Sequence, residues 1–158
     1  LNCRIEGLLH TSPTRVILDK NLKIRKNSKI LKTSKKIKTI IFYNKMNNNK
    51  LKILKKLNIK LIWMPVNYEK NLKLKEILKK LKNLGFSRIF LESGLNLTKS
   101  FLNENLVDDF KLFISSNKLG NEGDGNIKKY LNLLLKNKKK VTEKVNLLGE
   151  KLISYKIS

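Results

Sequence analysis

The chain has 158 residues, a mass of 18.4 kDa and 41% hydrophobic residues, a length that suits one domain and an apolar content sufficient for a core. Its apolar runs fall short of the roughly 18 residues needed to cross a bilayer, and its start does not have the pattern of a signal peptide. Cys3 and His10 are the only cysteine and histidine, which excludes an internal disulfide and a structural zinc site.

The formal charge of +24 comes from 36 Lys and Arg residues against 12 Asp and Glu residues. Clustered basic residues gain affinity for nucleic acids by releasing counterions from phosphates, but only four of the 36 are arginine, the better bidentate reader of phosphates. The chain also has 20 Asn residues and lacks Ala and Gln, a bias that an AT-rich coding sequence produces. The lysine excess therefore favours a solvated surface over a nucleic-acid partner.

The charge is unevenly distributed along the chain. Residues 20–82 carry 21 basic and two acidic side chains, and residues 128–158 carry nine and two. Residues 83–127 instead hold four basic and six acidic side chains. Because the lysine bias spares this stretch, we expect a functional site within it.

The first half of the chain alternates between strand and helix patterns. Thr14–Asp19 and Lys38–Tyr43 are β-branched and aliphatic runs typical of buried strands. Apolar residues recur at helical spacing within Leu51–Leu57, and Ile59–Met64 returns to strand character. Leu72–Leu84 follows the i, i+3, i+4, i+7 pattern and is predicted to be an amphipathic helix.

The middle of the chain reads as strand, small-residue turn and helix. Gly85 is a typical residue for the end of the preceding helix, and Arg88–Leu91 is predicted to be a short apolar strand. This strand leads into Glu92-Ser93-Gly94 and then into a helical pattern that includes Leu97 and Phe101.

The last third completes an α/β pattern. Asp108–Ser116 alternates as a half-buried strand, and the glycine-rich segment 120–125 is predicted to be a flexible loop. Lys140–Leu147 and Lys151–Ile157 are predicted to form a closing hairpin. The order of elements indicates an α/β domain over residues 1–158 with a mostly parallel sheet and an antiparallel end.

The turn at Glu92-Ser93-Gly94 is the leading candidate site. A helix that begins after a strand offers unpaired backbone N–H groups and the positive end of its dipole, and Ser93 and Gly94 lack bulk that would keep a phosphate away. Ligands of open α/β sheets lie beyond the carboxyl ends of the strands, so the Glu92 carboxylate is a candidate ligand contact. The same residues also fit a plain connection, with Glu92 interacting only with the helix dipole.

Other carboxylates have weaker patterns. Asp19 follows the first strand at its carboxyl end. Because Lys20-Asn21 comes next, a turn-forming role for Asp19 is favoured over a ligand contact. Asp108 and Asp109 are adjacent on a predicted strand and would point to opposite faces. A metal site or an acid/base pair is therefore not expected at this position.

The remaining reactive or aromatic residues are expected to be structural. His10 lacks a Ser or Cys partner at a recognisable spacing, and Cys3 is expected to be an inert small side chain. Trp63 and Phe90 lie within predicted strands, so both are expected in the core.

Several motifs in this order resemble one known family. The run RIFLESGLNLTKSFLNENLVDDFKLFISSNKLG (Arg88 to Gly120) is similar to the hallmark segment of the bacterial riboflavin-biosynthesis reductase domain, the C-terminal half of the bifunctional pyrimidine deaminase/reductase. The matching pieces are Glu92-Ser93-Gly94, Leu106-Val107-Asp108-Asp109 and Lys118-Leu119-Gly120. TRVILD at Thr14–Asp19, Leu1-Asn2-Cys3-Arg4 and the closing segment Leu147–Leu152 also resemble family motifs.

The resemblance implies a dihydrofolate-reductase-like fold and an enzyme that uses NADPH to reduce the ribose of 5-amino-6-(5-phosphoribosylamino)uracil to ribitol. The partner implied is that pyrimidine phosphoribosyl substrate, with a cytoplasmic location, no membrane contact, no metal and possible pairing as a homodimer. The implied substrate contacts are Leu1, Arg4 and Glu92. The implied cofactor contacts are Lys20, Gly94, Leu95, Asn96, Leu97, Thr98, Lys99 and Ser100.

The chain departs from the family at three points. Lys20 replaces a small hydroxyl residue that faces the cofactor, and Leu95 replaces a usual proline, which loosens the turn without removing its N–H donors. The chain also starts with Leu1 inside a family motif, so we expect an N-terminally truncated reductase domain. Two other functions stay open: an RNA-binding module that uses the lysine-rich helices of residues 47–84, and an inactive homologue that keeps the fold.

Overall fold

The structure is a computed structural model that describes residues 3, 5–117, 128–144 and 150–157. It has two compact units, Leu1–Ser87 and Arg88–Ser158, and each is described by itself. The predicted loop at 120–125 lies outside the described residues. The prediction of a single domain stays a prediction at this point.

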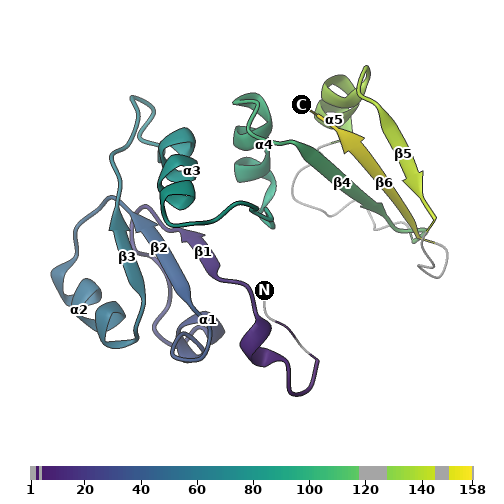
Figure 1. Ribbon diagram of the computed structural model, residues 1–158. Helices are drawn as coiled ribbons and strands as arrows, with labels where there is room; N and C mark the ends of the chain where they lie inside the picture. Colours follow the sequence, from purple (N-terminus) through teal and green to yellow (C-terminus); the bar gives the residue numbers. More distant parts are fainter. Residues whose placement is uncertain (1–2, 4, 118–127, 145–149, 158) are drawn as a thin grey trace. The chain divides into compact units, whose positions relative to one another are not determined.

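The first unit is built on a parallel sheet with the strand order β1-β2-β3 (Figure 1). All three strands lie inside the ranges predicted for them. The elements are a 3₁₀ helix (Leu9–Thr11), β1 (Arg15–Leu18), α1 (Lys29–Lys32), β2 (Thr39–Tyr43), α2 (Asn48–Lys56), β3 (Lys60–Trp63) and α3 (Leu74–Asn83).

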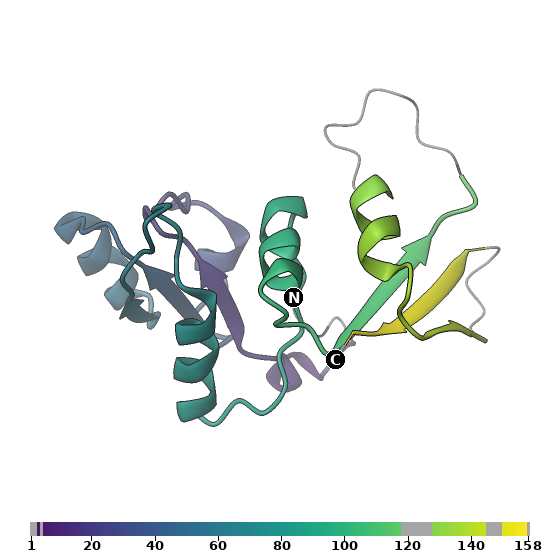
Figure 2. The same cartoon turned by 90° about the horizontal axis from the view of Figure 1, so that it is seen from above.

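The core of the first unit lies on both faces of β2, whose five residues are all buried. Because neighbouring residues of a strand point to opposite faces, Ile41 and Tyr43 share one face and Phe42 lies on the other. The first face packs against α1 and α2 through Leu31 and Leu54. Figure 2 shows α3 on the other side of the sheet from α1 and α2. The lysine-rich helices thus contribute their apolar sides to a real core.

Arg15 holds the end of this sheet together. Its guanidinium donates to Thr39 Oγ1 at 2.9 Å, to Thr33 Oγ1 at 2.7 Å, and to the carbonyl oxygens of Ile30 at 3.1 Å and Ile37 at 3.3 Å. All of these acceptors are uncharged, and burial lowers the pKa of Arg15 below its usual value. Arg15 therefore joins β1 to α1 and to the loop before β2.

The end of α3 is closed by the glycine that the sequence indicates. Gly85 has a φ of +88° and donates its N–H to the Lys82 carbonyl at 2.9 Å, while the Phe86 N–H reaches the Leu81 carbonyl at 3.2 Å. These two bonds form a Schellman motif. The prediction that Gly85 ends the helix is confirmed.

Gly85→Ala is expected to lower the free energy of unfolding by about 1–2 kcal/mol, because a Cβ is strained at positive φ. A Cβ at Gly85 would meet no atom within 4 Å, so strain of the backbone is the only cost. Gly85→Asn is the matched control, since Asn also adds a Cβ in the same open space but adopts positive φ more readily than Ala. Urea unfolding of both variants measures the difference, and equal losses would contradict this account.

The prediction of a strand at Arg88–Leu91 is wrong. These residues form no strand, and Ile89 and Phe90 are 46% and 70% exposed. An isolated strand leaves its backbone N–H and C=O groups without partners, and no described strand pairs with this segment. The prediction that Trp63 is buried is also wrong. Trp63 is 52% exposed on β3, an edge strand of the sheet, and its Nε1 donates to the Asn44 carbonyl at 3.0 Å.

The second unit contains an antiparallel sheet with the strand order β4-β6-β5 (Figure 1). The predicted antiparallel hairpin is confirmed, and the strand before it joins it in one sheet. Leu102 and Leu131 are buried in its core and pack against Phe110. The elements are α4 (Leu95–Asn103), β4 (Asp109–Ile114), α5 (Lys128–Leu135), β5 (Lys140–Glu143) and β6 (Lys151–Lys156).

A polar cluster links the three strands of this sheet. Ser154 Oγ donates to Glu143 Oε1 at 2.6 Å, and Lys111 Nζ lies 3.3 Å from the same oxygen. The Ser154 hydrogen bond, followed by Lys111, holds the pKa of Glu143 below its ordinary value of 4.5. A carboxylate whose pKa is lower in the folded than in the unfolded state stabilises the fold at pH values above its unfolded-state pKa. This contribution is lost as the pH falls through the folded-state pKa.

Ser154→Ala is expected to raise the pKa of Glu143 toward 4.5, because Ser154 is the largest cause of the depression. A carboxyl ¹³C NMR titration measures this change directly. Thr142→Ala, on the neighbouring exposed position of β5, is the control and should leave the titration unchanged. An unaltered pKa in Ser154→Ala would contradict the assignment.

Among the described residues, no helix is both long and apolar enough to span a membrane. The described part of the chain also contains no group of three or more His, Cys, Asp or Glu residues arranged to hold a metal ion.

Candidate functional site

The first turn of α4 carries the leading candidate site. Gly94 is the N-cap residue, with a φ of −67° and a ψ of 168°, and no side chain caps the helix. The first helical hydrogen bond runs from Thr98 N to the Gly94 carbonyl at 3.2 Å. The N–H groups of residues 95–97 therefore have no acceptor within the helix, and they lie at the positive end of its dipole.

The surroundings of Gly94 are open. A Cβ built at this position would meet no atom within 4 Å, and Glu92, Ser93 and Gly94 are all exposed. An anion can thus approach the backbone donors without displacing a side chain, which is the property that phosphate sites at helix N-termini share.

The turn before α4 is held by two hydroxyl groups. Ser93 Oγ and Thr98 Oγ1 lie 2.9 Å apart, and Thr98 Oγ1 also lies 3.3 Å from the Gly94 carbonyl oxygen. Ser93 therefore bonds to a side chain one turn further on and leaves the N–H groups of the first turn uncapped. The Glu92 carboxylate precedes this turn and makes no hydrogen bond or ion pair with the described residues.

Two residues further along α4, Lys99 and Asn103, contact Tyr130 of α5 in the same unit. Lys99 Nζ lies 5.5 Å from the centroid of the Tyr130 ring, a cation–π distance, and Ser100 Oγ donates to the Asn96 carbonyl at 3.1 Å. The Tyr130 hydroxyl also bonds to Asn103 Oδ1. Of the predicted cofactor residues, those of the first turn have backbone donors available, while Lys99 and Ser100 have partners within the unit. Tyr130 was not among the predicted site residues, although Tyr130, Leu131, Leu134 and Leu135 have helical spacing.

Asp19 and Lys20 follow β1 at its carboxyl end. Both carboxylate oxygens of Asp19 accept backbone N–H bonds at 2.7 Å, from Lys23 and Ile24. This confirms the turn-forming role of Asp19. Lys20 is half-buried, and its Nζ donates to the Lys70 carbonyl at 2.5 Å. Leu1 and Arg4 lie outside the described residues.

The chain is similar to known proteins over most of its length. The model of the RibD C-terminal domain family matches residues 1–147. Riboflavin biosynthesis protein RibD of Aquifex aeolicus (strain VF5) is 32% identical over 146 residues, which cover 90% of this chain and 38% of the relative.

Two solved structures have a similar fold. Acinetobacter baumannii RibD, form 1, matches with a TM-score of 0.60 at 18% identity, over 91% of this chain and 37% of that one. A pyrimidine reductase-like protein from Corynebacterium diphtheriae matches with a TM-score of 0.66 at 20% identity, over 92% of this chain and 61% of that one. The chain thus spans less than two thirds of each relative.

Proposed function

Because the chain belongs to the RibD C-terminal domain family, we propose that it reduces the ribose of 5-amino-6-(5-phosphoribosylamino)uracil to ribitol in riboflavin biosynthesis, with NADPH as reductant. The observation that carries the proposal is the family match over residues 1–147. This match includes residues of both units, which supports a single reductase-type domain. The expected location is the cytoplasm.

The first turn of α4 fits the cofactor of this proposal. Uncapped N–H groups of residues 95–97 and the open space at Gly94 suit a nucleotide phosphate. When bound, NADPH supplies the reducing equivalents. The contribution of α4 is to hold and orient an anion through backbone donors, so its side chains need not carry charge for this purpose.

The substrate contacts belong to other residues. Glu92 is exposed at the start of the same turn, and its carboxylate would accept hydrogen bonds from hydroxyl or amino groups of the pyrimidine substrate. Leu1 and Arg4 would complete the substrate site, with the Arg4 guanidinium as the partner of the substrate phosphate. Lys20 would pair with an anionic group of the cofactor.

Substrate-dependent oxidation of NADPH tests the proposal. The chain, NADPH and the pyrimidine substrate are combined at moderate salt, and loss of NADPH absorbance is followed. Oxidation is expected only when all three are present. Saturable NADPH binding without any oxidation would contradict the reductase assignment and favour an inactive homologue that keeps the fold.

A further inference from the structure

A cavity lies at the end of the parallel sheet where its three strands begin. Asp19 and Lys20 lie at the other end of the sheet, where β1 stops. It has a volume of about 510 Å³, within the range of small-molecule sites in proteins. Its lining comes entirely from the first unit and combines Ile40, Leu84 and Phe86 with four lysines.

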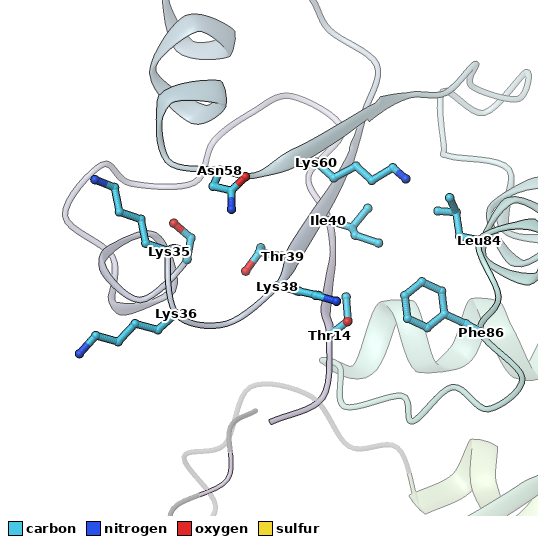
Figure 3. A pocket seen from close by; sticks show the side chains of 11 residues that line it. Thr14, Lys35, Lys36, Lys38, Thr39, Ile40, Asn58, Lys60, Leu84 and Phe86 are labelled. Carbon is cyan, nitrogen blue, oxygen red and sulfur yellow. The ribbon is translucent and has the colours of Figure 1, made fainter. Parts of the chain in front are cut away.

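Strand geometry brings two of the lysines to one face. Ile40 on β2 pairs with Lys60 on β3 in a parallel register, so the two side chains share a face. Lys38 precedes Ile40 by two residues and belongs to the same face. Figure 3 shows the Lys38 and Lys60 ammonium groups extending toward the side where Leu84 and Phe86 lie, whereas those of Lys35 and Lys36 extend away from it.

The apolar wall is set by the end of α3. Gly85, at a φ of +88°, turns the chain so that Phe86 follows directly after the last turn of the helix. Phe86 and Leu84 are half-buried, and Ile40 is 5% exposed. The cavity therefore offers a buried aliphatic floor and an accessible aromatic ring beside two ammonium groups.

The positive charge of this cavity is uncompensated. Its lining includes no Asp or Glu, and neither Lys38 nor Lys60 makes a hydrogen bond or ion pair with the described residues through its ammonium group. The hydroxyls of Thr39 and Ser34 are already bonded to backbone carbonyls at 3.0 Å and 2.8 Å. The charges thus favour an anionic ligand, and the Phe86 ring favours one with an aromatic part.

We propose that this cavity binds a small phosphorylated aromatic compound of the nucleoside monophosphate class. The phosphate lies between Lys38 and Lys60, and the base lies against Phe86 above Ile40. This site is separate from the first turn of α4, and it does not depend on the proposed reductase activity.

AMP is the probe, and its binding is measured by equilibrium dialysis at moderate salt. The variant Lys38→Gln/Lys60→Gln is expected to bind AMP at least about tenfold more weakly, because it loses two charge-assisted contacts. Lys35→Gln/Lys36→Gln is the matched control, since it removes the same charge from the lining of the same cavity. Because these two ammonium groups extend away from Phe86 (Figure 3), the affinity is expected to change by less than about twofold. All four lysines are exposed, and circular dichroism checks that each variant is folded.

Further ligands distinguish the sources of binding. Inorganic phosphate and adenosine should each bind more weakly than AMP, and Phe86→Leu should weaken AMP while leaving inorganic phosphate unchanged. Equal losses in the two lysine variants would overturn the proposal, as would inorganic phosphate binding as tightly as AMP. The proposal would also be overturned if Gly94→Asp lost AMP binding while Lys38→Gln/Lys60→Gln kept it, because the nucleotide would then bind at α4. Binding of single-stranded RNA with no measurable binding of AMP would overturn it in favour of a polyanion surface.

Discussion

Gly94→Asp is expected to raise the stability of the fold slightly while it abolishes the binding of NADPH. Asp is a better N-cap residue than Gly, by a few tenths of a kcal/mol, and the open surroundings of Gly94 accept a side chain. The same carboxylate places a negative charge where the nucleotide phosphate is proposed to bind. A like-charge juxtaposition costs several kcal/mol, which is more than about a hundredfold in affinity.

Gly94→Asn is the matched control for this experiment. Asn has nearly the same size and caps a helix as well as Asp, but it carries no charge. Fluorescence titration with NADPH should give an affinity for the Asn variant at least about tenfold higher than for the Asp variant. Urea unfolding should give both variants the same small gain in stability. Equal NADPH affinities for the two variants would remove α4 from the nucleotide site.

Arg15→Met is expected to lower the free energy of unfolding by about 2–4 kcal/mol, because each buried acceptor that loses its donor costs about 1–3 kcal/mol. Thr39 is only 3% exposed, and its hydroxyl would lose the guanidinium donor that lies 2.9 Å away. The carbonyl oxygens of Ile30 and Ile37 would each lose one donor and keep a threonine hydroxyl as the other.

Two further arginine variants separate this effect from charge. Arg15→Lys keeps the charge but lacks the planar fork that reaches several acceptors at once, so its loss should be intermediate. Arg25→Met removes the same charge from an exposed position and should change stability by less than about 0.5 kcal/mol. Urea unfolding compares the variants, and a similar effect at both positions would contradict the structural role of Arg15.

The sequence predicts those elements whose signal is local. Strands β1, β2 and β3 are continuous apolar runs, and α2 and α3 have clear helical spacing, so each appears close to its predicted range. The segment 88–91 has an apolar composition similar to that of these strands. A strand also needs a second strand to pair with, and the sequence of the segment alone does not show whether one is present. The four-residue α1 is too short to leave a periodic pattern.

The candidate site and the structural role of Arg15 differ in how far local sequence predicts them. The uncapped turn at Gly94 is predicted from local sequence, since a strand-like run, small residues and a helix follow one another there. The role of Arg15 is not, because an arginine at a strand end looks like a solvated charge until the loop before β2 is placed against it. Lys99 likewise has a partner, Tyr130, that is distant in sequence.

The proposed reduction of a phosphoribosyl pyrimidine by this chain is best tested by the mass of the product. The chain is incubated with 5-amino-6-(5-phosphoribosylamino)uracil and NADPH that carries deuterium at the transferable position of the nicotinamide, and the pyrimidine is analysed by mass spectrometry. We expect a ribitylamino product that contains one deuterium from the nucleotide. Recovery of the unreduced substrate from a folded chain that binds NADPH would contradict it.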